Sequence, residues 1–439
     1  MIVERVTRSK RALWYCAQTF FSQCAWLSSD LGFGSHVDET LVEWLTKCKS
    51  TNVYKCQGKF RNMTANEDEM IVTPWEVAGK IDYEKLIRDF GTQPLTPELL
   101  ERIRKHTGEL HPQLERRIFF SHRDLAWLLE KYENGEKFVL YTGRGPSGPV
   151  HIGHLAPWIF TKYLQDKFDV KLYFQITDDE RFLYHDNFTM VEPQKWAYEN
   201  ALDLIALGFD PKKTRIILDT KNIDKLYALA LKVAKHVTFS TAKAVFGFQE
   251  STNIGLLFYP AIQAAPAFLE SELVGHNVPC LIPAAIDQDP YWRITRDVAP
   301  KLGYYKPAQI HCRFVPGLGR GGKMSASLPE TAIFTVDSPE QARKKIMSAF
   351  TGGRATVEEQ RSLGANPDIC SVFSYDYFLF MNTNEIEDLR YRCLAGDIMC
   401  GECKSVLAER VTKFLIEHQE KREKAKDRFE EYLFNGKDY

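Results

Sequence analysis

The sequence lacks any long uninterrupted apolar stretch and any excess of charge of one sign. The best candidate for a membrane segment, residues 12–27, is shorter than the ~20 residues that a spanning helix needs and is broken by Gln18, Ser22 and Gln23. The 57 Lys and Arg residues are balanced by 58 Asp and Glu residues. We therefore expect no membrane association, and only a local basic patch could hold a polyanion.

The ten cysteines lack the spacing of a secreted disulfide framework and the two C-x-x-C pairs of a zinc site. Four of them lie in the N-terminal segment: Cys16, Cys24, Cys48 and Cys56. Cys393, Cys400 and Cys403 are spaced loosely like metal ligands, but a second pair is missing, so we expect no zinc there. Reduced thiols in a cytoplasmic protein are the simplest interpretation.

At 439 residues, 44% of them hydrophobic, the chain is long enough for two or three domains. Residues 1–66 form a separate block, first aromatic and rich in cysteine, then polar, and we predict a domain boundary near residue 66. The start of this block is basic, as transit peptides are, but its amphipathic pattern is poor. The sequence leaves the structure of this extension open.

Strand and helix patterns alternate through the centre of the chain. Residues 137–141 read as a short apolar strand, followed by a Gly/Pro-rich turn, a helix over 154–168 and a strand over 170–176. Further strands and helices are predicted at residues 214–218, 226–237, 280–286 and from residue 291. The fold class is therefore α/β, with a Rossmann-like parallel sheet in a domain of residues 67–340.

Helical patterns flank this centre on both sides. Residues 83–117 are predicted as helices interrupted by Pro94 and Pro97, followed by a helix over 123–132. Residues 341–439 are predicted as a second, all-helical domain that ends in a charged amphipathic helix from residue 404 to about 434.

The turn after the first predicted strand, residues 142–148, has the features of a phosphate site. Its glycines let the backbone approach a ligand closely, and the helix that follows presents free N–H groups and a positive dipole end. His151 and His154 stand three positions apart at the start of that helix, and Gly153 between them leaves room for a purine or ribose. Two such imidazoles could donate to phosphate oxygens as charge builds at the phosphorus.

Other interpretations of the histidine pair stay open. A metal site would want a third ligand nearby, and the acidic residue of an H-E-x-x-H motif is absent. The two histidines could also serve the structure alone. A Walker loop is excluded, because no Gly-Lys-Ser/Thr follows the turn.

A second Gly-rich loop, residues 317–327, carries a lysine. Its glycines let it move, Lys323 could follow a leaving pyrophosphate as a point charge, and Ser325 and Ser327 add short donors. Alone, such a loop is more often a flexible basic connection. The two segments together are far more specific than either one.

The two segments resemble the HIGH and KMSKS signatures of class I aminoacyl-tRNA synthetases. Residues 151–154 match the first at every position, whereas in residues 323–327 Ala326 replaces the second lysine, so Lys323 would carry more of the work. Five further segments resemble tryptophanyl-tRNA synthetases of the eukaryotic type: residues 118–124, 141–147, 175–180, 261–266 and 285–291. The resemblance runs from about residue 67 to the C-terminal helix and leaves out residues 1–66.

The resemblance implies activation of L-tryptophan with Mg²⁺-ATP and transfer of the product to tRNA(Trp). It also implies a homodimer, with anticodon reading in residues 341–439. Tyr141 and Gln175 would receive the indole N–H, which must find an acceptor in an apolar pocket. The α-ammonium would be held by Glu180, Gln263 and Gln288, with Thr177 nearby.

The resemblance also assigns residues to ATP and to catalysis. Arg144 would face the phosphates, and Asp287 with the backbone around Ala285 would hold the ribose. The residues so assigned to ATP are Arg144, Gly145, Gly153, His154, Ala285, Ile286, Asp287, Lys323, Met324, Ser325 and Ser327. Catalysis would rest on His151, His154, Lys323 and Arg144, acting by position and charge without an enzyme nucleophile or a metal held by the protein alone.

Each assignment has a plain structural alternative. Asp178, Asp179 and Glu180 could be a solvated helix start, and Tyr141 could be ordinary core. Gln263 could cap a turn before Pro266. Asp287 or Asp289 could cap a helix that begins at Tyr291. For the whole chain, a tyrosyl-tRNA synthetase and a non-catalytic tRNA- or partner-binding paralogue stay open.

Lys323→Ala is expected to slow adenylate formation far more than it weakens tryptophan binding, because the lysine would act on the leaving pyrophosphate. ATP–pyrophosphate exchange and equilibrium tryptophan binding measure the two effects. Equal exchange rates in the variant and the wild type would contradict the role.

Overall fold

The computed structural model describes residues 70–72, 77–78, 81–320, 324 and 328–436. All of these belong to one compact unit, Glu67–Tyr439. The expectations for residues 1–66 lie outside the described residues, and the domain boundaries at residues 66 and 340 stay predictions.

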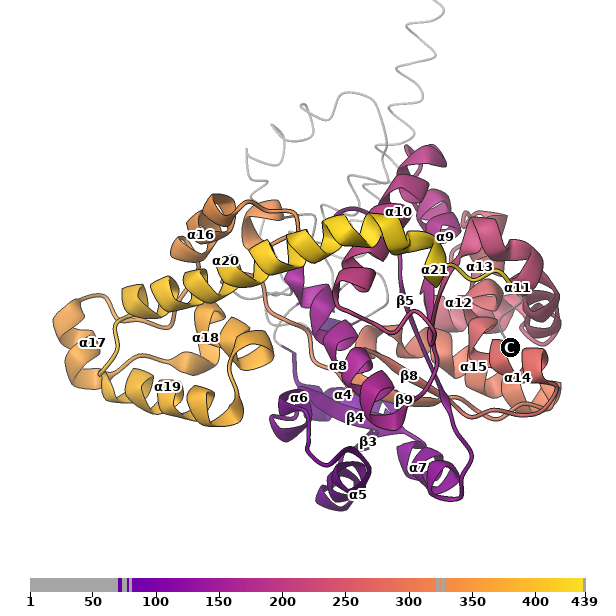
Figure 1. Ribbon diagram of the computed structural model, residues 1–439, viewed down its shortest axis with the longest axis horizontal. Helices are drawn as coiled ribbons and strands as arrows, with labels where there is room; N and C mark the ends of the chain where they lie inside the picture. The colour runs from indigo at the N-terminus through magenta and orange to yellow at the C-terminus, as the bar shows by residue number, and fades with distance from the viewer. Residues whose placement is uncertain (1–69, 73–76, 79–80, 321–323, 325–327, 437–439) are drawn as a thin grey trace, which may run out of the picture. The chain divides into compact units, whose positions relative to one another are not determined.

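A seven-stranded sheet forms the centre of the molecule, in the order β3-β4-β9-β8-β5-β6-β7 (Figure 1). Its strands are β3 (Gln93–Pro94), β4 (Phe119–Arg123), β5 (Val139–Arg144), β6 (Leu172–Ile176), β7 (Thr214–Leu218), β8 (Cys280–Ala285) and β9 (Ala308–Cys312). Strands β9, β8, β5, β6 and β7 run parallel, and β4 and β3 add an antiparallel edge. This architecture confirms the predicted α/β class with a Rossmann-like sheet.

Alternate residues of the central strands enter two separate cores, because successive side chains of a strand point to opposite faces. Leu140, Leu172 and Phe174 face the core built by α8 (Ile152–Phe168) and α10 (Val191–Ala206). Tyr141 and Tyr173 face the other core. The helices of that second face are α11 (Asp219–Ala234), α12 (Phe239–Phe246), α13 (Ile254–Ala264), α14 (Pro266–Val274) and α15 (Asp289–Leu302). Burial on both faces explains why these strands read as continuous apolar runs.

The N-terminal elements differ in part from the prediction. Helices α4 (Tyr83–Phe90), α5 (Pro97–Thr107) and α6 (Pro112–Glu115) are present, but Pro97 begins α5 rather than interrupting a helix, since proline suits the first helical position. The helix predicted from residue 123 begins only at Leu125, as α7 (Leu125–Glu133), because the preceding residues form β4. A short hairpin pairs β1 (Ile71–Val72) with β2 (Val77–Ala78).

Helices α16 to α21 form the C-terminal part. They are α16 (Pro339–Met347), α17 (Val357–Leu363), α18 (Ser371–Tyr375), α19 (Thr383–Ala395), α20 (Cys400–Ala425) and α21 (Phe429–Tyr432), and the chain between α18 and α19 makes a π-helical turn (Asp376–Phe380). The predicted final helix is divided, since α20 ends at Ala425 and a 3-10 turn separates it from α21. No helix of the described part is both long and apolar enough to cross a membrane.

Helix α20 returns toward the part of the molecule that contains the sheet and packs along α10 (Figure 1). In α20, Nε2 of His418 lies 2.9 Å from Oδ1 of Asp203 on α10, and Nε of Arg422 lies 3.2 Å from the same oxygen. Beyond α21 the chain joins the sheet, because the Phe434 N–H donates to the Ile216 carbonyl at 2.9 Å and Asn222 donates to the Phe434 carbonyl at 2.8 Å. These contacts cover the β7 edge of the sheet.

Asp203→Ala is expected to lower the free energy of unfolding by about 3 kcal/mol, because Asp203 is 1% exposed and its loss strips His418 and Arg422 of a buried partner. Urea denaturation measures the change. Glu423→Ala, on the same helix as His418 and Arg422, removes an exposed partner of Lys426 and should leave the unfolding midpoint nearly unchanged. Equal effects of the two substitutions would contradict the argument.

Candidate active site

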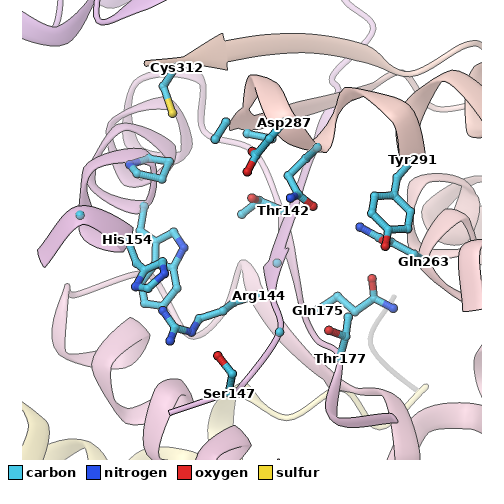
Figure 2. A pocket seen from close by; sticks show the side chains of 18 of the residues that line it. Thr142, Arg144, Ser147, His154, Gln175, Thr177, Gln263, Asp287, Tyr291 and Cys312 are labelled. Carbon is cyan, nitrogen blue, oxygen red and sulfur yellow. The ribbon is translucent and has the colours of Figure 1, made fainter. Parts of the chain in front are cut away.

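A cavity of about 420 Å³ opens at the carboxyl ends of the parallel strands. Its wall comes from the ends of β5, β6 and β8, the segment after β9, the start of α8 and the buried side of α13. Ligands of open α/β sheets bind at this edge, where crossovers leave in opposite directions. Figure 2 shows His154 and Arg144 on one side of the cavity, and Gln263 and Tyr291 on the opposite side.

The two histidines meet at the first turn of α8, whose N-cap is His151. The His151 N–H donates to Nδ1 of His154 at 3.3 Å, and the rings stack with their centroids 3.5 Å apart. A Cβ on Gly153 would lie 3.1 Å from Nδ1 of His151 and 3.3 Å from the Met324 sulfur. The glycine therefore makes room for these two side chains at the cavity wall.

Arg144, the last residue of β5, is buried beside the turn that precedes α8. Its Nη2 donates to the carbonyls of Gly148 and Pro149 at 3.4 and 3.2 Å, whereas Nε and Nη1 have no hydrogen-bond partner among the described residues. Burial, with a smaller contribution from Arg181, lowers the pKa of Arg144 to about 9. A buried guanidinium with unused donors calls for an anion in the cavity.

Gly145 lies directly against Arg181, so a Cβ at this position would fall 2.2 Å from Nε of Arg181. Nε of Arg181 in turn lies 3.0 Å from a carboxylate oxygen of Glu180. Glycine at residue 145 thus lets a second guanidinium reach the cavity beside Arg144.

A chain of buried polar groups closes the other end of the cavity. The Tyr141 hydroxyl lies 2.5 Å from Oε1 of Gln175 and 2.6 Å from the Gln263 carbonyl, so its proton is engaged by an acceptor. Nε2 of Gln175 donates to both carboxyl oxygens of Asp219, at 2.8 and 3.0 Å. Tyr141 is therefore not ordinary core alone, and Asp219, the first residue of α11, fixes which way the Gln175 amide points.

Three acidic residues form the start of α9 (Asp178–Tyr184), but two of them are not solvated as the structural alternative supposed. Asp178 and Glu180 are 1% and 3% exposed. Asp178 accepts from the N–H and the hydroxyl of Thr220. Burial raises the pKa of Asp179 to about 6, and burial with the neighbouring Asp179 raises the pKa of Asp219 further. Such a pair of buried carboxyl groups is stable when it shares a proton.

The remaining tryptophan candidates also reach the cavity. Thr177, Glu180, Gln263 and Gln288 line it. Burial raises the pKa of Glu180, and the nearby Arg181 opposes that shift. The amide oxygen of Gln263 has no hydrogen-bond partner among the described residues, although Gln263 is only 8% exposed. It is therefore an unused acceptor rather than a turn cap.

The ATP candidates are only partly brought together. Gly145, Ala285, Asp287 and Met324 line the cavity, but Ile286 is fully buried behind it among Leu86 and Phe120, so its side chain is not at the wall. Lys323, Ser325 and Ser327 lie outside the described residues. The cap alternatives for Asp287 and Asp289 are wrong, since Gln288 is the N-cap of α15, and Asp289 pairs instead with Arg123 and Arg293.

Several cavity residues were not predicted from the sequence. Tyr259, Trp292 and the segment after β9, including Arg313, line the wall, and the Trp292 ring meets Tyr141 edge-on at 5.2 Å. The run Ala308–Cys312 has the length and apolarity of a buried strand, and residues that follow such a strand were the available signal. Within the described residues no three His, Cys, Asp or Glu side chains are arranged to hold a metal ion.

Comparison with known proteins agrees with this geometry. The sequence model of the tRNA synthetases class I (W and Y) matches residues 133–416, more than half of the chain. The chain belongs to this family. A tryptophan–tRNA ligase of Pyrobaculum calidifontis is 52% identical over 371 residues, covering 84% of this chain and 99% of the relative. One of Pyrococcus furiosus is 54% identical over 375 residues, covering 84% and 96%.

Solved structures of this synthetase family share the fold. The tryptophanyl-tRNA synthetase of Plasmodium falciparum superposes with a TM-score of 0.77 at 38% identity, over 82% of this chain and 98% of that one. The one of Encephalitozoon cuniculi, bound to tryptophan, gives 0.75 at 36% identity, over 81% and 98%. The resemblance to class I synthetases drawn from the two signatures is thereby confirmed.

Gly143→Ala is expected to lower the free energy of unfolding by roughly 1–3 kcal/mol, because its Cβ would lie 2.5 Å from the Gln175 carbonyl oxygen on the paired strand β6. Thermal or urea unfolding measures the loss. Gly148→Ala is the matched control, since its Cβ would meet nothing within 4 Å. Equal stability of the two variants would contradict the close approach of β5 and β6.

Proposed function

We propose that the chain is a tryptophan–tRNA ligase. It activates L-tryptophan with ATP to tryptophanyl-adenylate, releases pyrophosphate, and transfers the tryptophanyl group to the 3′-terminal ribose of tRNA(Trp). The observation that carries the proposal is one cavity with two different ends. Arg144 and the α8 N-terminus offer hydrogen-bond donors to an anion at one end, and Tyr141 and Gln175 offer hydrogen-bond acceptors at the other. Curated tryptophan–tRNA ligases at about 52% identity over 84% of the chain support the same reaction.

The hydrogen-bonded groups of Tyr141, Gln175 and Asp219 at one end of the cavity suit an indole. Since the Tyr141 proton is engaged by Gln175 or by the Gln263 carbonyl, the hydroxyl oxygen keeps a lone pair for the indole N–H. A tyrosine pocket would instead want a carboxylate aimed at the ring hydroxyl. Asp219 is the carboxylate behind Gln175, but it is fully buried and already bonded to that amide, which favours tryptophan over tyrosine.

The α-amino group of tryptophan has a set of acceptors beside the indole site. Glu180 and the unpartnered amide oxygen of Gln263 line the same cavity, with Gln288 and Thr177. A carboxylate loses its contacts with water when it is buried. The bound ammonium compensates for that loss, because it pairs with the carboxylate. The tryptophan carboxylate is then directed toward the phosphate end.

The reaction at that end needs position and charge rather than an enzyme nucleophile. The substrate carboxylate attacks the α-phosphorus in line, while His151, His154, Arg144 and the α8 N-terminus stabilise the growing negative charge. Lys323, in the loop that reaches the cavity through Met324, would follow the pyrophosphate. Asp287 and the backbone at Ala285 would hold the ribose.

Magnesium would arrive with the nucleotide. Mg²⁺ keeps several waters and usually binds substrate phosphates with one or two carboxylates rather than a full protein cage. Glu180 and Asp287 line the cavity but have other partners in this proposal, so the substrate phosphates and water would chiefly hold the metal. When bound, the metal would supply positive charge that offsets the charge of the phosphates. Anticodon reading by residues 341–439, a homodimer and a cytoplasmic location belong to the same proposal.

ATP–pyrophosphate exchange tests the proposal directly. In this exchange reaction the full chain should show a kcat/KM for tryptophan at least about a hundredfold higher than that for tyrosine. It should then charge tRNA(Trp). Exchange that prefers tyrosine would make the chain a tyrosyl enzyme, and no exchange with either amino acid would leave a non-catalytic paralogue.

Asp219→Leu is expected to reduce the preference for tryptophan over 3-benzothienylalanine, in which sulfur replaces the indole N–H, by about tenfold or more. Without Asp219, the Gln175 amide can rotate and offer a donor where the indole needs an acceptor. The kcat/KM values for both amino acids in pyrophosphate exchange give the ratio.

Asp219→Asn is the matched control, because its carboxamide oxygen still accepts from Gln175 Nε2 and should retain the preference. A purely structural role for Asp219 would lower both kcat/KM values by the same factor. An unchanged ratio in the leucine variant would therefore overturn its part in recognition.

A further inference from the structure

A fully buried asparagine on α10 holds the turn that precedes α8. Asn200 is 0% exposed, and its Nδ2 donates to the Gly148 carbonyl at 3.0 Å. A carbonyl oxygen can only accept, so the nitrogen end of the amide must face it. The amide oxygen of Asn200, in contrast, has no hydrogen-bond partner among the described residues. The nitrogen end therefore serves the turn, while the oxygen end serves no described group.

An amide placed in this way does little for stability alone. A buried acceptor without a partner costs free energy, because it gave up its hydrogen bonds to water on folding. Leucine has nearly the same shape as asparagine and would leave no unsatisfied atom in α10. Unsatisfied polar groups inside a folded protein call for an explanation, and functional sites are where local rules of stability are broken. The effect of Asn200 is therefore to be sought at the Gly148 carbonyl.

The same carbonyl is a neighbour of the Arg144 guanidinium. Nη2 of Arg144 lies 3.4 Å from the Gly148 oxygen and 3.2 Å from the Pro149 oxygen, which are long distances for N–H···O bonds. The bond from Asn200 is shorter and occupies the Gly148 oxygen more fully. Arg144 is left with loose contacts to the turn, and no described residue uses its Nε and Nη1 donors.

Helix α10 also acts on Arg144 through charge. Asp203 follows Asn200 by three positions, which places both side chains on one face of the helix. Burial lowers the pKa of Arg144 to about 9, the charge of Arg181 adds to that shift, and the charge of Asp203 opposes it. The guanidinium therefore stays charged at neutral pH while its donors stay available, as the binding of an anion requires.

We propose that Asn200 is a positioning residue for the nucleotide: it holds the Gly148 carbonyl and thereby keeps the Arg144 guanidinium available to the ATP phosphates. Buried backbone carbonyls need a hydrogen-bond donor. Without the Asn200 amide, the donor left to the Gly148 oxygen among the described side chains is Nη2 of Arg144, which is drawn into a shorter bond with the turn. Donors engaged there are lost to the phosphates. The inference rests on the ligase proposal, which assigns Arg144 to ATP.

Asn200→Leu tests this role by the binding of Mg²⁺-ATP and of tryptophan to the full chain, each measured by calorimetry. The variant should bind Mg²⁺-ATP about tenfold more weakly, because Arg144 no longer offers its donors to the phosphates. Its affinity for tryptophan should stay at the wild-type value, since Arg144 lies at the other end of the cavity (Figure 2). In pyrophosphate exchange, the KM for ATP should rise while the KM for tryptophan does not.

A double-mutant cycle with Arg144→Met separates positioning from a general effect on the turn. If Asn200 acts through Arg144, Asn200→Leu should change the affinity for ATP by less than about twofold once the guanidinium is gone. Thermal unfolding of Asn200→Leu should stay close to that of the wild type, because leucine also removes the unsatisfied amide oxygen. Asn200→Ala removes the same donor without adding bulk, so it carries the test if leucine does not fit.

Asn277→Leu is the matched control. Nδ2 of Asn277 likewise donates to a glycine carbonyl, that of Gly303 at 2.8 Å. Asn277 precedes the amino end of β8, whereas the cavity opens at the carboxyl ends of the strands. This variant should keep the wild-type affinity for ATP.

Two results would overturn the proposal. One is an unchanged affinity for ATP in both Asn200 variants. The other is a loss of affinity that is equally large with and without the Arg144 guanidinium. A wild-type chain that binds ATP but catalyses no exchange would instead contradict the ligase proposal, and the ATP-binding cycle would still measure the coupling of Asn200 to Arg144.

Discussion

The orientation of one buried amide, that of Gln175, constrains the whole cavity. The amide has one accepting and one donating end, and the fold places the Asp219 carboxyl behind it and the Tyr141 hydroxyl in front. Three elements must meet for this to hold: β5, β6 and the start of α11. The parallel register that sets Gly143 opposite Gln175 brings them together, and only glycine fits that close approach.

Charge at the two ends of the cavity is organised by different means. At the phosphate end, the α8 N-terminus and the unused donors of Arg144 create a place for negative charge. At the amino-acid end, burial raises the pKa of Asp179 on α9, and burial together with the charge of Asp179 raises the pKa of Asp219 on α11, so that a proton replaces one negative charge. A neutral indole and a highly charged nucleotide can therefore occupy neighbouring parts of one space.

Much of this fold and site was predictable because it follows local rules. The strands β5, β6, β7 and β8 are apolar runs buried on both faces, and the turn before α8 carries its own glycines and histidines. Strands β4 and β9 were missed because their polar residues, such as His122, Gln309 and His311, satisfy one another or nearby backbone only in the folded protein. Asp219 was missed for a related reason, since its partner Gln175 lies 44 positions away along the chain.

The return of residues 433–434 to the edge of β7 has a consequence for the order of assembly. During synthesis, the strand at that edge is made long before the segment that covers it. Asn222, just after the strand, and Phe434, in the covering segment, are 212 residues apart in the sequence. Until that segment leaves the ribosome, the N–H and C=O groups of β7 remain open to other strands. The nascent protein must therefore avoid self-association at an edge that the finished molecule no longer presents.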